Sequence, residues 1–199
     1  MADIDANLPD LSVVHKRLRC RTFPHEAQKE PLRPGDNAAM TSSFLDKLAS
    51  RTSLAARVAA LPRPVVFTNG VFDILHRGHV TYLAQARALG ASLVIGLNSD
   101  VSARSLGKGP DRPLNAEADR ACVLAALESV SLVALFDEST PVELLKLVRP
   151  QIYVKGGDYD IEALEETRWV RSWGGEAHAL GFVSGYSTTA LVQRILGKG

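Results

Sequence analysis

Two histidines, His76 and His79, stand three residues apart behind the apolar run 65–67 and the turn Thr68-Asn69-Gly70. A short apolar run before such a turn is typical of a buried parallel strand. The residues from His76 to about Leu89 predict a helix, and a spacing of three puts both imidazoles on one face of its first turn. Because a helix N-terminus offers free N–H groups and a positive dipole end, this unit predicts an anion site.

Gly78 lies between the two histidines. A Cβ at this position would stand where a phosphate or nucleobase approaches the backbone, so we expect Gly78 to be part of the nucleotide site. The alternative is that His76 and His79 are ordinary surface or core histidines. That alternative explains neither the preceding strand and turn nor the glycine, and we favour the anion site.

The segment T-N-G-V-F-D-I-L-H-R-G-H, residues 68–79, resembles the H-x-G-H signature of the nucleotidyltransferase superfamily, which includes cytidylyltransferases and class I tRNA synthetases. Over roughly residues 44–196 the likeness is to the heptose 1-phosphate adenylyltransferases of lipopolysaccharide core synthesis. The resemblance implies that His76 and His79 are catalytic. It implies further site residues in the same segment: nucleotide-binding Thr68, Asn69, Gly70 and Phe72, and substrate-binding Asp73. The family usually has cysteine at Val71, so a thiol has no role there.

The length, charge and cysteine content of the chain limit the class of protein and its partners. The 199 residues are 46% apolar and 23% charged, which predicts one globular domain with some extra length. A net charge of +1 gives no reason to expect a nucleic-acid partner. Cys20 and Cys122 form neither a disulfide framework nor a metal motif. With no signal peptide and no apolar run that spans a bilayer, we expect a cytoplasmic protein without a membrane partner.

Residues 1–41 contain Pro9, Pro24, Pro31 and Pro34 and no sustained apolar periodicity, so they are predicted to be a flexible extension. Their basic run could contact a partner, although a solvated tail is the simpler interpretation. Met40 is a possible natural start. Residues 42–199 form the predicted nucleotidyltransferase domain, which opens with an amphipathic helix over 44–60.

The rest of the chain alternates strands and helices, which predicts a Rossmann-like, doubly wound α/β fold with five parallel strands. The strands are expected at 65–67, 92–97, 131–136, 152–154 and 177–180, and the later helices at 115–128, 140–149, 161–173 and 187–196. The resemblance implies the strand order 3-2-1-4-5. Ligands bind where the order reverses, at the carboxyl ends of the first and fourth strands.

Lys155, Gly156 and Asp158 follow the fourth strand. A lysine directly after a buried strand favours contact with a phosphate; pairing with a carboxylate such as Asp158 is the alternative. Gly156 lets the backbone approach a nucleotide, and Asp158 can accept from a ribose hydroxyl or the adenine amino group. Asn98 and Ser99 end the second strand and are expected to bind the substrate, although both residues also favour turns.

The segment 102–113 is predicted to be a flexible basic loop that closes over phosphates with Lys108 and Arg112; solvated surface charge is the alternative. Arg112-Pro113-Leu114-Asn115 and Glu117-Ala118-Asp119-Arg120 resemble the family's R-P-x-N and E-x-D-R. The resemblance makes Arg112 and Arg120 nucleotide-binding. An exposed helical arginine is the alternative for Arg120.

Gly185-Tyr186-Ser187-Thr188-Thr189 resembles the second superfamily signature, a hydroxyl-rich helix start that holds the distal phosphates. Capping alone needs only Ser187, so the additional Thr188 and Thr189 favour phosphate binding.

No carboxylate pair, serine triad or cysteine nucleophile stands out, and the chemistry needs none. A sugar 1-phosphate is largely dianionic at neutral pH and can attack the α-phosphorus of ATP directly. Mg²⁺ would be held mainly by the ATP phosphates, while His76, His79, Lys108 and Lys155 provide donors and charge. The products are ADP-heptose and pyrophosphate. The resemblance also implies a homodimer, and about 60 residues before the first strand suggest a form without the sugar-kinase domain of some relatives.

Two alternatives remain. A cytidylyltransferase acting on glycerol phosphate or a similar alcohol phosphate has the same chemistry, but such relatives open with G-x-F-D and tend to carry an acidic residue at Gly157. A catalytically silent nucleotide-binding module is the second, and the two histidines with the hydroxyl-rich helix start argue against it.

Overall fold

The computed structural model describes residues 44–107, 112–157, 160–181, 185–195 and 197. These residues belong to one compact unit, residues 35–199. The extension predicted at 1–41 lies outside the described residues, as do Lys108 and Asp158. The proposed boundary at residue 42 therefore stays a prediction.

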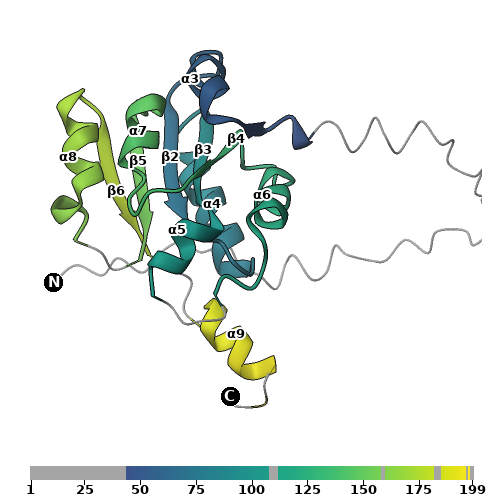
Figure 1. Ribbon diagram of the computed structural model, residues 1–199. Coiled ribbons are helices and arrows are strands. Elements are labelled where there is room, and N and C mark those ends of the chain that lie inside the picture. Colours follow the sequence, from purple (N-terminus) through teal and green to yellow (C-terminus); the bar gives the residue numbers. More distant parts are fainter. Residues whose placement is uncertain (1–43, 108–111, 158–159, 182–184, 196, 198–199) are drawn as a thin grey trace, which may run out of the picture. The chain divides into compact units, whose positions relative to one another are not determined.

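The described chain forms a parallel six-stranded sheet in the order β1-β4-β3-β2-β5-β6 (Figure 1). The strands are β1 (Leu48–Ala49), β2 (Val65–Gly70), β3 (Ser92–Asn98), β4 (Leu132–Phe136), β5 (Ile152–Gly156) and β6 (Glu176–Leu180). The α/β class is confirmed. The five predicted strands are present in their predicted order, and β2 and β5 are neighbours across the point where the order reverses.

The predicted number of strands was wrong, because residues 44–60 do not form one helix. Leu48 and Ala49 pair with Val133 and Ala134 at the edge of β4. They separate the helical residues Phe44 and Leu45 from the helix α3, which covers Arg51–Ala59. The Ser50 hydroxyl accepts from the Ser53 N–H and starts α3. Phe44 and Leu48 pack on one face of the sheet, whereas Leu54 and Val58 of α3 pack on the other. A single helix has one apolar face, so it cannot pack against both faces of the sheet.

Helices cover both faces of the sheet. On one face α3, α7 (Val142–Val148) and α8 (Glu165–Ser172) pack on a core that includes Val65 and Phe67. On the other face α4 (Arg77–Ala88) and α6 (Glu117–Ala125) pack on a core that includes Val66. The alternation of Val65, Val66 and Phe67 between the two cores follows from the period of two along a strand. The strand is therefore apolar on both sides.

Other element boundaries also differ from the predictions. The loop predicted from residue 102 begins as a helix, α5 (Asp100–Ser105), which the Ser99 hydroxyl caps. The helix predicted over 140–149 is α7 (Val142–Val148), and its N-cap Pro141 provides no side-chain hydrogen bond. The helix predicted over 161–173 is divided into the short 3-10 helix η1 (Ile161–Ala163) and α8.

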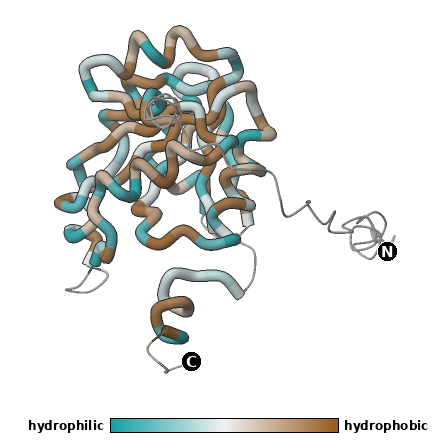
Figure 2. Tube along the Cα trace, turned by 90° about the vertical axis from the view of Figure 1, so that its right-hand side faces the viewer, coloured by the Kyte–Doolittle hydropathy of each residue, from teal (hydrophilic) through white to brown (hydrophobic). Residues whose placement is uncertain are grey.

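The last helix, α9 (Thr188–Ile195), starts as predicted, because the Ser187 hydroxyl accepts from the Ala190 N–H at 3.0 Å. Figure 2 shows apolar residues on α9, near the C-terminal end of the chain. Within the described ranges, no helix combines the length and apolarity needed to cross a membrane.

Candidate active site

A cavity of about 580 Å³ lies at the carboxyl ends of β2, β3 and β5. This is the position that the reversal of strand order predicts. Most of the residues expected to form the site line it: Asn69, Gly70, Phe72, Asp73, His76, His79, Asn98, Arg112, Lys155, Gly156, Ser187, Thr188 and Thr189. Segments separated by more than 100 residues in the sequence therefore meet around one space.

The two imidazoles of the H-x-G-H segment are stacked, with ring centroids 3.9 Å apart and planes 19° from parallel. Phe72 packs edge-on against His79 at 5.4 Å. Its backbone has a φ of 47°, in the left-handed region that bulky residues seldom adopt. Such conformations cost about 1–3 kcal/mol and persist where the surroundings enforce them. Here the strained turn brings the Phe72 ring against the stacked histidines.

Burial and the neighbouring His76 lower the pKa of His79 to about 4, and burial also lowers the pKa of His76. Both rings are therefore neutral at pH 7, which avoids repulsion between two imidazolium ions in close contact. Each neutral ring has one N–H to donate to an anionic oxygen. An arriving polyphosphate would add negative charge and raise both proton affinities.

Gly78 has a different role from the one expected. A Cβ added there would lie 3.0 Å from the His76 ring and 3.1 Å from the Cβ of Tyr186. The absent side chain therefore makes room for protein atoms, not directly for a ligand. Gly78 allows the segment before α9 to pack against the first turn of α4.

The start of α9 lies beside the start of α4. Tyr186 packs near His76, with ring centroids 6.3 Å apart, and the Arg77 guanidinium lies 5.8 Å from the centre of the Tyr186 ring. Ser187, Thr188 and Thr189 line the same cavity as the histidines. Two helix N-termini and three hydroxyls thus border one space, which suits a chain of phosphates.

Lys155 at the end of β5 reaches across to the end of β2. Its Nζ donates to Asn69 Oδ1 at 3.2 Å, and the Tyr153 hydroxyl donates to the same oxygen at 3.1 Å. Asn69 thereby positions the ammonium group at the edge of the cavity. Because Asp158 lies outside the described residues, the expected alternative of a Lys155–Asp158 pair is not tested.

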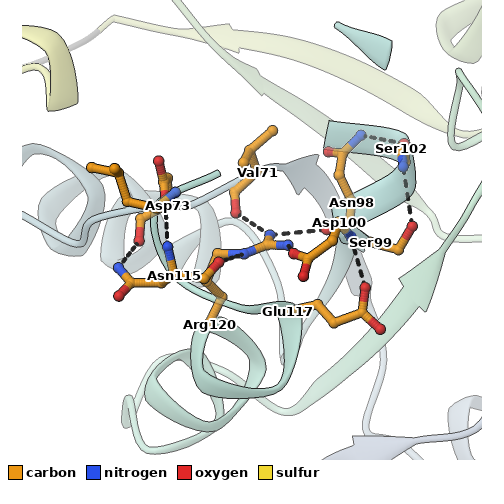
Figure 3. A network of polar contacts seen from close by, with 10 residues as sticks. Val71, Asp73, Asn98, Ser99, Asp100, Ser102, Asn115, Glu117 and Arg120 are labelled. Carbon is orange, nitrogen blue, oxygen red and sulfur yellow. Dashed lines mark hydrogen bonds and ion pairs between the residues drawn. The ribbon is translucent and has the colours of Figure 1, made fainter. Parts of the chain in front are cut away.

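Asp73 lines the cavity, but its carboxylate already has protein partners. It accepts from Arg112 Nη1 at 2.7 Å and from the backbone N–H groups of Leu114 and Asn115 at 2.8 and 3.0 Å. Asp73 therefore anchors the segment that carries Arg112. Figure 3 shows the contacts of Asp73 with Asn115 in this segment. The role expected from the resemblance, contact with the sugar, competes with this anchoring.

Arg120 is neither a cavity residue nor an exposed helical arginine. Its side chain is 1% exposed and forms a network with four residues (Figure 3). It donates to the carbonyls of Val71, Asn98 and Asn115 at 2.6, 2.9 and 3.0 Å, and to Asp100 Oδ1 at 2.7 Å. Arg120 therefore joins the turns that follow β2 and β3, and it acts on the cavity through them.

Two further expected residues do not line the cavity. Thr68 is fully buried, and its hydroxyl lies 2.6 Å from the hydroxyl of Tyr82. Burial raises the pKa of Tyr82 to about 12, so this hydroxyl stays protonated. Ser99 is also buried and caps α5. Both residues support the walls of the cavity.

Ser139, Thr140 and Glu166 line the cavity but were not expected from the sequence. Ser139 and Thr140 follow β4, and their position after a strand was a usable signal. Glu166 lies in the first turn of α8, where an acidic residue is usually explained by the helix dipole. Nothing in the sequence distinguishes it from its neighbour Glu165.

Comparisons with known proteins agree with this geometry. The model of the Cytidylyltransferase-like family matches residues 67–194. The D-beta-D-heptose 1-phosphate adenylyltransferase of Bordetella bronchiseptica is 59% identical over 157 residues, which are 78% of this chain and 97% of that protein. The Bifunctional protein HldE of Magnetococcus marinus is 51% identical over 153 residues, 75% of this chain and 31% of that larger protein.

Among solved structures, the chain resembles the lipopolysaccharide core biosynthesis protein from Thermoplasma volcanium GSS1, with 30% identity and a TM-score of 0.51. The match covers 62% of this chain and 98% of that one. The shared fold extends over nearly the whole of the smaller protein.

Proposed function

Because the chain belongs to the cytidylyltransferase-like family, we propose that it transfers AMP from ATP to a heptose 1-phosphate, giving ADP-heptose and pyrophosphate. The observation that carries the proposal is the cavity in which His76, His79, Lys155 and the start of α9 meet. The name of the Bordetella bronchiseptica relative supports the choice of ATP and of the sugar phosphate.

In the proposed reaction, an oxygen of the sugar 1-phosphate forms a bond to the α-phosphorus of ATP. The bond from that phosphorus to the oxygen bridging to the β-phosphate breaks, and pyrophosphate leaves. No proton needs to be removed from a dianionic nucleophile, so the protein contributes positioning and charge stabilisation. His76 and His79 would donate to the oxygens that gain charge, while Lys155 and Arg112 balance the phosphates.

Pyrophosphate would leave at the start of α9. Ser187, Thr188 and Thr189 offer hydroxyls, and the first turn of the helix offers N–H groups. ATP would enter with Mg²⁺ bound to its phosphate oxygens, which neutralises charge on the triphosphate. In the described part of the chain, no group of three or more His, Cys, Asp and Glu side chains is arranged to hold a metal ion.

A pyrophosphate-release assay tests the proposal. The purified protein is given ATP or CTP, with heptose 1-phosphate or glycerol phosphate, and Mg²⁺. We expect release with ATP and heptose 1-phosphate together, and little without the sugar phosphate. Release with CTP and glycerol phosphate would indicate the cytidylyltransferase alternative. No release with any pair would indicate a silent nucleotide-binding module.

Variants connect that activity to the cavity. His76→Ala and His79→Ala should each lower turnover by roughly 10²-fold, the usual effect of losing one preorganised donor. His178→Ala is a matched control, because His178 lies on β6, does not line the cavity and has a half-exposed side chain. Wild-type turnover in both cavity variants would remove the central role of the histidines.

The homodimer expected from the resemblance stays a prediction.

A further inference from the structure

Glu166 has an unusual environment for a carboxylate. It is the second residue of α8, it is 8% exposed, and it lines the cavity. Among the residues that the structure describes, none donates a hydrogen bond to it or forms an ion pair with it. Its neighbour Glu165 is exposed and accepts from Trp169 Nε1 at 3.3 Å. Of these two glutamates, Glu166 is therefore the one that is largely buried, lines the cavity and has no protein donor.

A largely buried carboxylate is unfavourable unless something donates to it. The dipole of α8 offsets part of this penalty. Asp73, the other carboxylate on the cavity wall, is already held by Arg112 and two backbone N–H groups. Glu166 would repel a phosphate, so the ligand atoms that reach it must be hydrogen-bond donors.

The position of Glu166 favours the sugar over the phosphates. His76 and His79 belong to the α4 side of the sheet, whereas α8 packs with α7 on the opposite face. Ser139 and Thr140 line the cavity just before α7. A carboxylate and two hydroxyl-bearing residues on the wall of one cavity suit a polyol, in which every hydroxyl both donates and accepts.

We propose that Glu166 accepts hydrogen bonds from hydroxyl groups of the sugar 1-phosphate and selects for them. This inference rests on the proposed function, because it identifies the side of the cavity that takes the sugar. A site built to bond a hydroxyl discriminates strongly against ligands that lack it, since the buried group is then left without a partner. Glu166 is thus a specificity-determining residue. The alternative donor to Glu166 is the amino group of adenine, and the experiment distinguishes it from the sugar hydroxyls.

The experiment measures kcat/KM for heptose 1-phosphate at saturating ATP and kcat/KM for ATP at saturating sugar phosphate. Glu166→Ala should lower the value for the sugar phosphate by at least about tenfold, the scale of one hydrogen bond to a charged group. The kcat/KM for ATP should change by less than about threefold, because in this proposal ATP loses no hydrogen bond in the variant. Glu166→Gln keeps the shape and one acceptor oxygen, so its loss should be smaller.

Glu165→Gln is the matched control, since it removes the same charge from the same turn of α8 at an exposed position. It should leave both values unchanged. A loss confined to ATP would assign Glu166 to the nucleobase and overturn the inference. Equal losses for both substrates with a lowered melting temperature in Glu166→Gln would make the residue structural and also overturn it.

The two proposals fail in different ways. A wild-type protein that releases no pyrophosphate from ATP and heptose 1-phosphate would overturn the proposed function and this inference together. An active wild type whose Glu166 variants match it in both kinetic values would overturn only the role of Glu166.

Discussion

Replacing Arg120 with methionine should destabilise the protein strongly, although Arg120 is not itself a cavity-lining residue. The substitution keeps much of the apolar stem and removes all donors of the guanidinium. It leaves the carbonyls of Val71, Asn98 and Asn115 without this donor, together with the Asp100 carboxylate. These groups lie in three segments, two of which contribute Val71 and Asn98 to the cavity wall.

The size of the effect follows from the burial of the network. Breaking a buried ion pair by removing one partner costs about 3–5 kcal/mol. Asp100 is 23% exposed and can regain some solvation, which favours the lower end of that range. A loss of about 3 kcal/mol corresponds to roughly 6–12 °C in the melting temperature of a domain of this size. Arg120→Lys keeps the charge but lacks the planar fork of donors. Its melting temperature should therefore lie between those of the wild type and Arg120→Met.

Thermal unfolding and turnover per folded molecule should be measured together, with Arg168→Met as the control. Arg168 lies on the exposed side of α8, and its replacement should change neither quantity. Turnover of Arg120→Met should also fall, because the turns after β2 and β3 lose their connection. An unchanged melting temperature with abolished turnover would refute this reasoning and support direct nucleotide contact instead.

Three other predictions follow from individual contacts. Because the pKa of His79 is about 4 in the folded protein and 6.5 is its ordinary value, the unfolded chain takes up this proton first, so stability should fall as the pH decreases from 6.5 towards 4. His79→Asn should show a smaller fall in melting temperature between pH 7.5 and 4.5, and an equal fall in both proteins would contradict the assignment. Thr68→Val should lower the free energy of unfolding by about 1–2 kcal/mol, because the Tyr82 hydroxyl loses a partner. Its turnover per folded molecule should change little, and a large loss with a normal melting temperature would place Thr68 in contact with the nucleotide. Lys155→Met should lower turnover at least about tenfold, the scale of one charge-assisted hydrogen bond, with a small change in melting temperature; a lowered melting temperature with normal turnover would make Lys155 structural.

Local patterns in the sequence were sufficient for the fold class and for the position of the cavity. The apolar run 65–67 and the helix from Arg77 are encoded by neighbouring residues. The turn predicted at 68–70 was wrong, because Thr68, Asn69 and Gly70 pair with β3 and extend β2 to Gly70. Periodicity and glycine turns are short-range signals, and the alternation of strands and helices leaves few possible topologies. The crevice between β2 and β5 follows from that topology, and so does the meeting of Asn69 with Lys155.

The division of polar residues between ligand and protein was decided only in three dimensions. Arg120 bonds Val71, 49 positions away, and Asp73 holds Asn115, 42 positions away. Glu166 and Glu165 look alike in the sequence, yet one lines the cavity and the other is exposed. A polar side chain forms its bonds with whatever group the fold places opposite it. For these residues the group comes from a distant segment or from the open cavity, and no local pattern specifies which.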